Sequence, residues 1–311
     1  MVPHRETGGV TSGRGSAGAR RAPAVGLAYS DLVRSFVRRH GSSVDYLEVP
    51  FELLRHDPAV FEDGLGKPVV LHCASLSVAG AVLCPEPVVE EIRRWAERTG
   101  TPWIGEHLAF VTANRVEGGR TGQPYAPGEP YNIGYTVSPP MNEDTLERVA
   151  ENVTSYASRF DVPLLLENSP LYFRVPGSTM TQTEFIGALC ARVPVGLLLD
   201  LSHLYITSRT MDFDVLEELE RLPLERVEEI HVSGVDEQPD GAWDDHANRA
   251  PAIVHRLLAR ALERAAPRAI TLEYNWSARF PPEVLRHEIA RVRRTVARSR
   301  GQHRDADPRT D

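Results

Sequence analysis

The chain has 311 residues, of which 41% are hydrophobic and 25% are charged, and its formal net charge is −8. This composition is typical of a globular protein with one large α/β domain or two ordinary ones. The acidic balance excludes a chain whose whole surface binds nucleic acid, because such surfaces are basic.

The sequence also disfavours membrane and extracellular roles. No apolar run approaches the ~20 residues that cross a bilayer, and no apolar segment of a secretory signal follows the arginines near the N-terminus. The three cysteines, Cys73, Cys84 and Cys190, are odd in number and too few for a disulfide framework. We therefore expect a cytoplasmic protein that has no membrane or nucleic-acid partner.

Apolar runs and segments of helical periodicity alternate along most of the chain. Residues 1–23 and 299–311 hold few large apolar side chains and are predicted to be disordered tails on a single domain, residues 24–298. The expected strands, in chain order, are 25–29, 44–49, 69–73, 103–110, 163–168, 196–200, 227–232 and 269–274. The expected helices between and after them are 31–39, 86–99, 143–159, 182–192, 212–221, 249–265 and 282–298.

Some boundaries have a clear chemical cause. Pro85 and Pro87 mark the start of the helix at 86–99, and Gly100 ends it. Asn142 is expected to cap the helix at 143–159. Residues 111–131 form a Gly-rich, polar insertion that is too long for an ordinary connection, so we expect a lid or a binding loop there.

Eight strands, nearly all followed by a helix, predict a closed (β/α)8 barrel of the TIM type. The strand at 196–200 is apolar without alternation, as expected when both faces are buried. A doubly wound sheet is the alternative, but no Gly-rich phosphate loop follows the first strand. In a barrel, the carboxyl ends of all strands open on one face, where catalytic groups gather.

Metal-binding side chains recur at the ends of these strands. They are five histidines, His72, His107, His203, His231 and His246, together with Glu106, Glu167, Asn168, Asp200, Asp244 and Glu273. Buried carboxylates raise one another's pKa, and a cation removes that cost. Because one zinc ion takes three or four ligands, so many candidates predict two or three ions of iron, manganese or zinc. Asn168 needs a bend or bulge to share the pocket with Glu167.

Other residues near these strand ends have less direct interpretations. Asp244 and His246 point the same way in an extended segment, and we predict that they are catalytic as well as metal-binding; an acidic surface turn is the alternative. Glu48 and Glu52 are candidates for groups just outside the ligands, although Glu52 also suits a helix start. Cys73 is interpreted as a buried structural cysteine that points away from the preceding histidine.

Taken in order, these segments resemble the multinuclear non-haem iron-dependent oxidative enzymes, also known as UPF0276 or domain of unknown function 692, which include an enzyme of methanobactin biosynthesis. The matching motifs are Leu47-Glu48-Val49-Pro50-Phe51-Glu52, Leu71-His72-Cys73-Ala74-Ser75-Leu76-Ser77, Glu106-His107-Leu108, Leu165-Leu166-Glu167-Asn168, Leu198-Leu199-Asp200-Leu201-Ser202-His203-Leu204-Tyr205, Ile230-His231-Val232-Ser233-Gly234, Asp244-Asp245-His246 and Leu272-Glu273. Four features depart from the family pattern, and one of them is Tyr274-Asn275-Trp276, which differs from the usual acidic end of the last strand. Glu106 stands where Asp is usual, Ser202 replaces a common Asn, and Val235 stands where many members have a second His.

The resemblance implies a TIM barrel that holds two or three irons (Fe2+/Fe3+) and uses dioxygen to modify a ribosomally made precursor peptide, at a Cys or Asp side chain. It also implies a separate recognition protein that delivers the peptide. The metal ligands that it implies are His72, His107, Glu167, Asn168, Asp200, His203, His231, Asp244, His246 and Glu273.

Two alternatives remain open at this stage. A zinc- or manganese-dependent hydrolase or isomerase on the same barrel, similar to endonuclease IV or to sugar isomerases, would activate water for attack on a phosphate or a sugar. A degenerate barrel would bind a peptide without metal and without catalysis.

Overall fold

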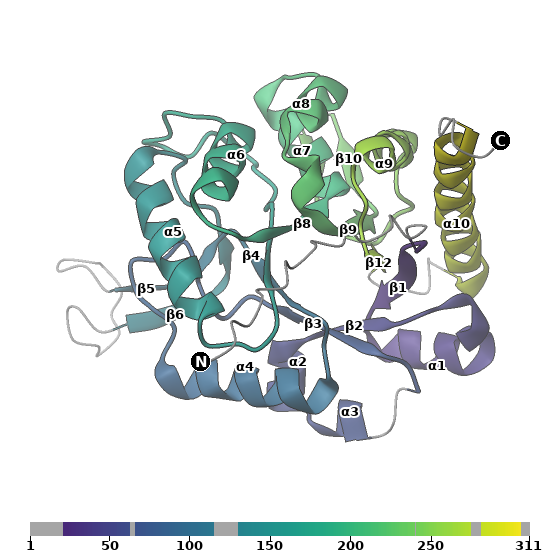
Figure 1. Cartoon of the computed structure of the whole chain (residues 1–311), viewed down its shortest axis with the longest axis horizontal. Coiled ribbons are helices and arrows are strands. Elements are labelled where there is room, and N and C mark those ends of the chain that lie inside the picture. The colour runs from purple at the N-terminus through teal and green to yellow at the C-terminus, as the bar shows by residue number, and fades with distance from the viewer. Residues whose placement is uncertain (1–20, 63–65, 115–129, 240, 275–280, 306–311) are drawn as a thin grey trace, which may run out of the picture.

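The computed structural model describes residues 21–62, 66–114, 130–239, 241–274 and 281–305, which contain a closed barrel of eight parallel strands (Figure 1). In sheet order these are β1 (Ala24–Ala28), β12 (Ala269–Glu273), β9 (Val227–Ser233), β8 (Gly196–Asp200), β7 (Leu164–Glu167), β4 (Ile104–His107), β3 (Val69–Cys73) and β2 (Leu47–Pro50). β2 pairs with β1 and closes the barrel. The predicted (β/α)8 barrel is confirmed, and the doubly wound alternative is wrong.

Helices surround the barrel and connect its strands (Figure 1). They are α1 (Asp31–His40), α2 (Phe51–His56), α3 (Ala59–Glu62), α4 (Glu86–Thr99), α5 (Glu143–Ala157), α6 (Gln182–Arg192), α7 (Leu201–Met211), α8 (Val215–Arg221), α9 (Ala252–Arg264) and α10 (Pro282–Asp305). The predicted caps of two helices are confirmed. The Asn142 side chain accepts a hydrogen bond from the Thr145 amide, and Gly100 ends α4 with a φ of 64°.

The helix predicted at 212–221 is wrong in its start, because α7 already begins directly after β8. The Asp200 carboxylate caps α7 by accepting a hydrogen bond from the His203 amide at 2.6 Å. Residues 201–208 are all buried, so α7 lacks the polar face by which an amphipathic helix is found in a sequence. The shorter α8 then covers most of the predicted range.

The predicted C-terminal tail at 299–311 is wrong as far as Asp305, since α10 continues past residue 298. Ser299 is buried, and its hydroxyl donates a hydrogen bond to the Leu262 carbonyl of α9 at 3.1 Å. Packing against α9 therefore extends a helix that its polar sequence alone does not predict. The rest of this tail and residues 1–20 of the predicted N-terminal tail lie outside the described residues.

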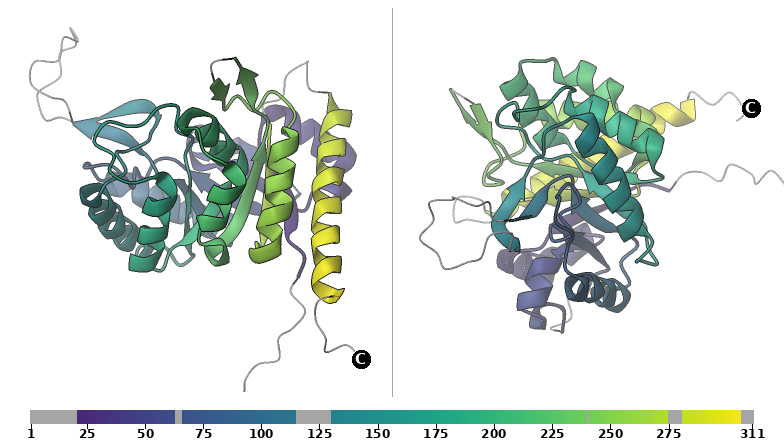
Figure 2. Two further views of the ribbon diagram at one scale, coloured as in Figure 1. Left: turned by 90° about the horizontal axis from the view of Figure 1, so that it is seen from above. Right: turned by 90° about the vertical axis from the view of Figure 1, so that its left-hand side faces the viewer.

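Two antiparallel hairpins extend from the face where the barrel strands end. β5 (Phe110–Asn114) pairs with β6 (Pro130–Val137) after β4, and β10 (Asp236–Gln238) pairs with β11 (Gly241–Trp243) after β9. Both views in Figure 2 place the two hairpins on the same side of the barrel. The predicted insertion at 111–131 thus begins and ends in strands, while its central residues 115–129 lie outside the described part of the chain.

Candidate metal centre

The interior of the barrel has an apolar layer beneath the strand ends. Its buried members form a small cluster that is separate from the large core between barrel and helices: Tyr46, Val70, Trp103, Leu165, Leu198 and Ala269. Because successive side chains of a strand point to opposite faces, residues two positions later enter the interior again, one layer closer to the mouth. This alternation places His72, Glu167 and Asp200 in the barrel directly above Val70, Leu165 and Leu198.

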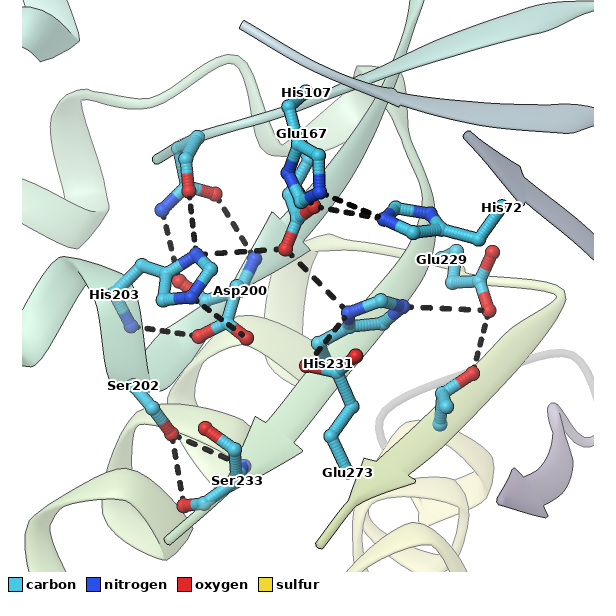
Figure 3. A network of polar contacts seen from close by, with 12 residues as sticks. His72, His107, Glu167, Asp200, Ser202, His203, Glu229, His231, Ser233 and Glu273 are labelled. Carbon is cyan, nitrogen blue, oxygen red and sulfur yellow. Dashed lines mark hydrogen bonds and ion pairs between the residues drawn. The ribbon is translucent and has the colours of Figure 1, made fainter. Parts of the chain in front are cut away.

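Glu167 lies at the centre of this upper layer (Figure 3). Its Oε2 is 2.7 Å from His107 Nδ1 and 3.3 Å from His72 Nε2. Its Oε1 is 3.4 Å from His203 Nδ1 and 3.5 Å from His231 Nδ1. Burial alone would raise the pKa of Glu167, but the facing imidazoles, His107 first, lower this pKa well below its usual range. The side chain is therefore a carboxylate, and each of its two oxygens faces two imidazoles.

The polar atoms of this pocket fall into three adjoining groups of residues that could hold metal ions, each with ligand-type atoms within 4.8 Å of one another. The groups are His72, His107 and Glu167; Glu167, Asp200, His231 and Glu273; and His203, Asp244 and His246. We call the first two, which share Glu167, the inner groups, and the third the outer group. Every predicted ligand except Asn168 belongs to one of them.

The buried polar atoms of the groups fit cations better than they fit one another. Within the described residues, Glu167 Oε2, Asp200 Oδ2, His231 Nδ1, Asp244 Oδ1 and His246 Nε2 have no hydrogen-bond partner. Yet His246 Nε2 lies only 2.8 Å from Asp244 Oδ1. Buried polar atoms normally find aligned partners, and lone pairs that converge without alignment are typical of atoms that share a metal ion.

The outer group depends on a loop held in an unusual backbone conformation. His203 Nε2 is 3.1 Å from Asp244 Oδ2, so α7 contacts the loop that follows β11. His246 has a φ of 56°, in the left-handed region that non-glycine residues rarely adopt. The loop is pressed against the end of β9, since a Cβ on Gly234 would lie 1.8 Å from the Asn248 carbonyl oxygen. This close approach directs Asp244 and His246 to the mouth of the barrel.

Charges in the pocket favour protonated imidazoles when no cation is bound. Burial alone would lower the pKa of His72, but the charge of Glu48 and the close Glu167 carboxylate raise it to about 10. Burial likewise opposes the effect of Glu273 and Asp244, which raise the pKa of His246 to about 9. Metal ions bind the neutral imidazole, so their binding at neutral pH must release protons.

Beneath the inner groups, Glu48 and Glu229 form with His231 a fourth group of residues that could hold a metal ion. His231 Nε2 is 2.9 Å from Glu48 Oε2, which leaves Nδ1 to face the pocket. Glu229 accepts hydrogen bonds from Trp103 Nε1 and Thr271 Oγ1, both at 2.6 Å. Burial and the charge of Glu48 raise the pKa of Glu229 to about 7. We missed Glu229 in the sequence, although its position two residues before His231 puts both side chains on one face of β9.

Asn168 and Glu106, two of the candidates from the sequence, have their polar atoms engaged elsewhere. The Asn168 side chain makes two hydrogen bonds to the backbone of Asp200, both at 2.9 Å. Its Nδ2 donates to the Asp200 carbonyl, and its Oδ1 accepts from the Asp200 N–H. Glu106 is fully buried and accepts hydrogen bonds from the amides of Leu76 and His107 at 3.0 Å. Glu106 thus holds the loop after β3, and it lies in none of the three groups.

The structure also places the neighbouring candidates Glu52 and Cys73. Glu52 is in the first turn of α2, and its Oε1 accepts hydrogen bonds from the Ser75 hydroxyl at 2.6 Å and from the Ala74 amide at 2.9 Å. Cys73 is buried, with its thiol 3.9 Å from Glu52 Oε1. Both residues therefore fix the loop after β3, as a structural cysteine does.

A closed barrel with a histidine–carboxylate cluster at its mouth is typical of a TIM-barrel metalloenzyme. A family profile described as "RiPP precursor modification enzyme MbnB/TglH/ChrH" matches residues 24–297. The chain belongs to this family, whose members modify precursors of ribosomally made peptides. None of the described helices is long and apolar enough to span a membrane.

Individual relatives agree with this assignment. A UPF0276 protein of Streptomyces avermitilis is 32% identical over 236 residues, which are 75% of this chain and 46% of the relative, so the chain spans less than half of that relative's length. A UPF0276 protein of Acaryochloris marina is 27% identical over 238 residues, or 76% of this chain and 80% of the relative.

Solved structures with a similar barrel include endonuclease IV from Thermus thermophilus, with a TM-score of 0.52, 17% identity and coverage of 88% of this chain and 100% of that chain. The apo form of 3-keto-D-glucoside 4-epimerase from E. coli has a TM-score of 0.52, 14% identity and coverage of 88% and 99%. Identities this low show a shared fold and nothing of the substrate.

Proposed function

We propose that this protein is an iron-dependent oxidative enzyme that uses dioxygen to modify a Cys or Asp side chain of a ribosomally made precursor peptide. The observation that supports the proposal most is the position of Glu167, because His72 and His107 face one of its oxygens while His203 and His231 face the other. Glu167 is thereby a member of two of the groups that would hold ions. Mixed imidazole and carboxylate ligands suit iron.

The three groups then provide three ion positions. His72, His107 and Glu167 would hold one ion, and Glu167, Asp200, His231 and Glu273 would hold a second. His203, Asp244 and His246 would hold a third. When bound, the ions supply the redox chemistry that amino-acid side chains lack. Asp244 and His246, whose side chains are partly exposed at the mouth, are the proposed catalytic residues that first meet the peptide.

The protein's own contribution is to orient these groups and to exclude water. Glu48 accepts a hydrogen bond from His231 Nε2–H and thereby keeps Nδ1 directed at the inner groups. Hydrogen bonds with two residues orient Asp200. The side-chain amide of Asn168 binds its backbone, and the backbone N–H of His203 donates to its Oδ1. Tyr46 and Trp103 fill the barrel below, so the peptide and dioxygen enter from the mouth.

The alternative functions explain less of this geometry. A hydrolase or isomerase with one activated water needs only three or four metal ligands, and the likeness to an endonuclease and an epimerase is one of fold alone. A non-catalytic barrel gives no reason for buried polar atoms that lack partners around Glu167.

The decisive experiment is metal analysis of the anaerobically purified protein, combined with oxygen consumption. A short reading frame beside the gene that encodes a Cys- or Asp-bearing peptide supplies the candidate substrate, co-expressed with any neighbouring recognition protein. We expect two or three irons per chain, oxygen uptake and a changed peptide mass. Zinc alone, without oxygen uptake, would contradict the proposal.

A further inference from the structure

Large exposed hydrophobic side chains lie on one side of the molecule. Within the described residues there are six, and all lie in segments that follow the carboxyl ends of barrel strands: Leu83, Tyr131, Tyr135, Tyr172, Phe173 and Trp243. The outward faces of the described helices carry none of them. Scattered single exposures need no explanation, but a one-sided distribution around a pocket marks an interaction surface.

Two of the six side chains, Tyr172 and Trp243, stack on each other, and Phe173 follows Tyr172 in the chain; we call these three residues the aromatic ledge. The rings of Tyr172 and Trp243 stack with centroids 4.9 Å apart and an interplanar angle of 24°. Tyr172 is 36% exposed, Trp243 50% and Phe173 62%. Stacking holds two rings in fixed orientations while much of their surface stays open to solvent, which lowers the entropic cost of binding a further apolar group.

The aromatic ledge is directly connected to the outer group. Trp243 immediately precedes Asp244 in the chain, and the Asp244 amide donates a hydrogen bond to the Tyr172 hydroxyl at 3.3 Å. Tyr172 and Phe173 lie in the segment that follows β7, the strand that carries Glu167. Trp243 ends the β10–β11 hairpin, which extends from the mouth face (Figure 2). The ledge therefore borders the pocket at which a substrate must arrive.

We propose that the aromatic ledge binds an aromatic or branched aliphatic side chain of the precursor peptide, at a fixed number of residues from the residue that is modified. This inference rests on the proposed function and specifies how the same site selects its substrate. Exposed, rigid Tyr and Trp side chains are typical anchors for peptide partners. An extended peptide advances roughly 3.3 Å per residue, so an anchor fixed beside Asp244 corresponds to one fixed offset along the peptide.

The test uses a displayed peptide library in which a fixed Cys or Asp is flanked on both sides by random residues. Peptides that bind the iron-loaded protein are selected under anaerobic conditions. We expect an aromatic or branched aliphatic residue at one offset, and Trp243→Ala to weaken binding of the selected peptides on the order of 10-fold. Trp243→Phe retains a ring and should restore most of the affinity. Tyr135→Ala removes an exposed aromatic side chain outside the ledge and is the matched control. Each variant must keep the wild-type metal content and melting temperature.

Several outcomes would overturn the inference. The inference fails if no peptide is selected, or if the selected peptides show no preferred offset. It also fails if the wild type and Trp243→Ala select the same peptides. The face would then serve another partner, such as the recognition protein. An equal effect of Tyr135→Ala would remove the assignment to the ledge. Failure of the proposed function gives a different result: peptides with the aromatic offset are selected equally by metal-free protein and are not modified.

Discussion

The inner and outer groups of the candidate centre are built in different ways. His72, His107, Glu167, Asp200 and His231 lie on barrel strands, and hydrogen bonds to neighbouring strands fix their positions. Asp244 and His246 lie on a loop, and the left-handed conformation of His246 costs free energy. We therefore expect the inner positions to be formed without a cation, and the outer position to depend more on a cation for its order.

Replacing Glu167 tests the inner groups and should have the largest effect. Glu167→Gln leaves facing imidazoles without the carboxylate that two ion positions share. Because loss of a residue outside the ligands already costs about 10- to 100-fold, we expect peptide modification to fall more than about 100-fold, with loss of both inner ions. The measurement is metal content with turnover. Glu218→Gln removes another buried carboxylate, on α8, and should keep every ion.

Replacing His246 tests whether the outer group is independent. His246→Asn suits the left-handed backbone, because Asn tolerates this conformation better than most residues. We expect one ion fewer per chain, inner ions that remain bound, and activity reduced on the order of 10-fold or more. Loss of all the ions together would show one cooperative centre, and the comparison between the two regions would then fail.

The support beneath the inner groups should have a smaller effect. Glu48→Ala removes the carboxylate that accepts a hydrogen bond from His231 Nε2–H. We expect the affinity of the inner groups for metal ions to fall by about 10- to 100-fold. Glu48→Gln keeps an acceptor and should lose less. The readout is the dissociation constant of the metal alone together with the spectrum of the bound iron. A spectrum unchanged in Glu48→Ala would argue against this role.

The smallest expected effect is the pH dependence of the metal-free protein. Folding raises the pKa of His246 to about 9 and that of His72 to about 10, from an ordinary value of 6.5. The folded state then binds more protons than the unfolded state, so stability should decrease as pH rises from about 6.5 to between 9 and 10. Glu229, raised from 4.5 to about 7, acts in the same direction at lower pH.

Urea unfolding with a chelator at pH values of about 6.5 and about 9 measures this effect. Bound metal displaces the same protons, so the metal-loaded protein should show the opposite trend. A metal-free protein that is more stable at the higher pH would mean that the imidazoles are neutral without a cation.

The sequence predicted the barrel and the inner groups because strand ends concentrate His, Asp and Glu side chains in one place. It did not predict α7, since a helix buried on all sides has no amphipathic pattern. Nor did it show that the Asn168 amide holds Asp200, because this depends on how β7 and β8 end side by side. All three residues of the outer group were predicted ligands, but the sequence did not show that His203 lies beside Asp244, because the loop of Asp244 is positioned by packing of Asn248 against Gly234.

Gly105 contributes no atom that can bind a metal, yet the inner groups depend on it. A methyl group at this position of β4 would lie 2.5 Å from His72 Nδ1 and 3.0 Å from a methyl carbon of Leu198. Gly105→Ala would therefore turn the imidazole away while every donor atom remained in the chain. A survey of inactivating mutations restricted to donor residues would overlook this position, which sets the room available to one of the donors.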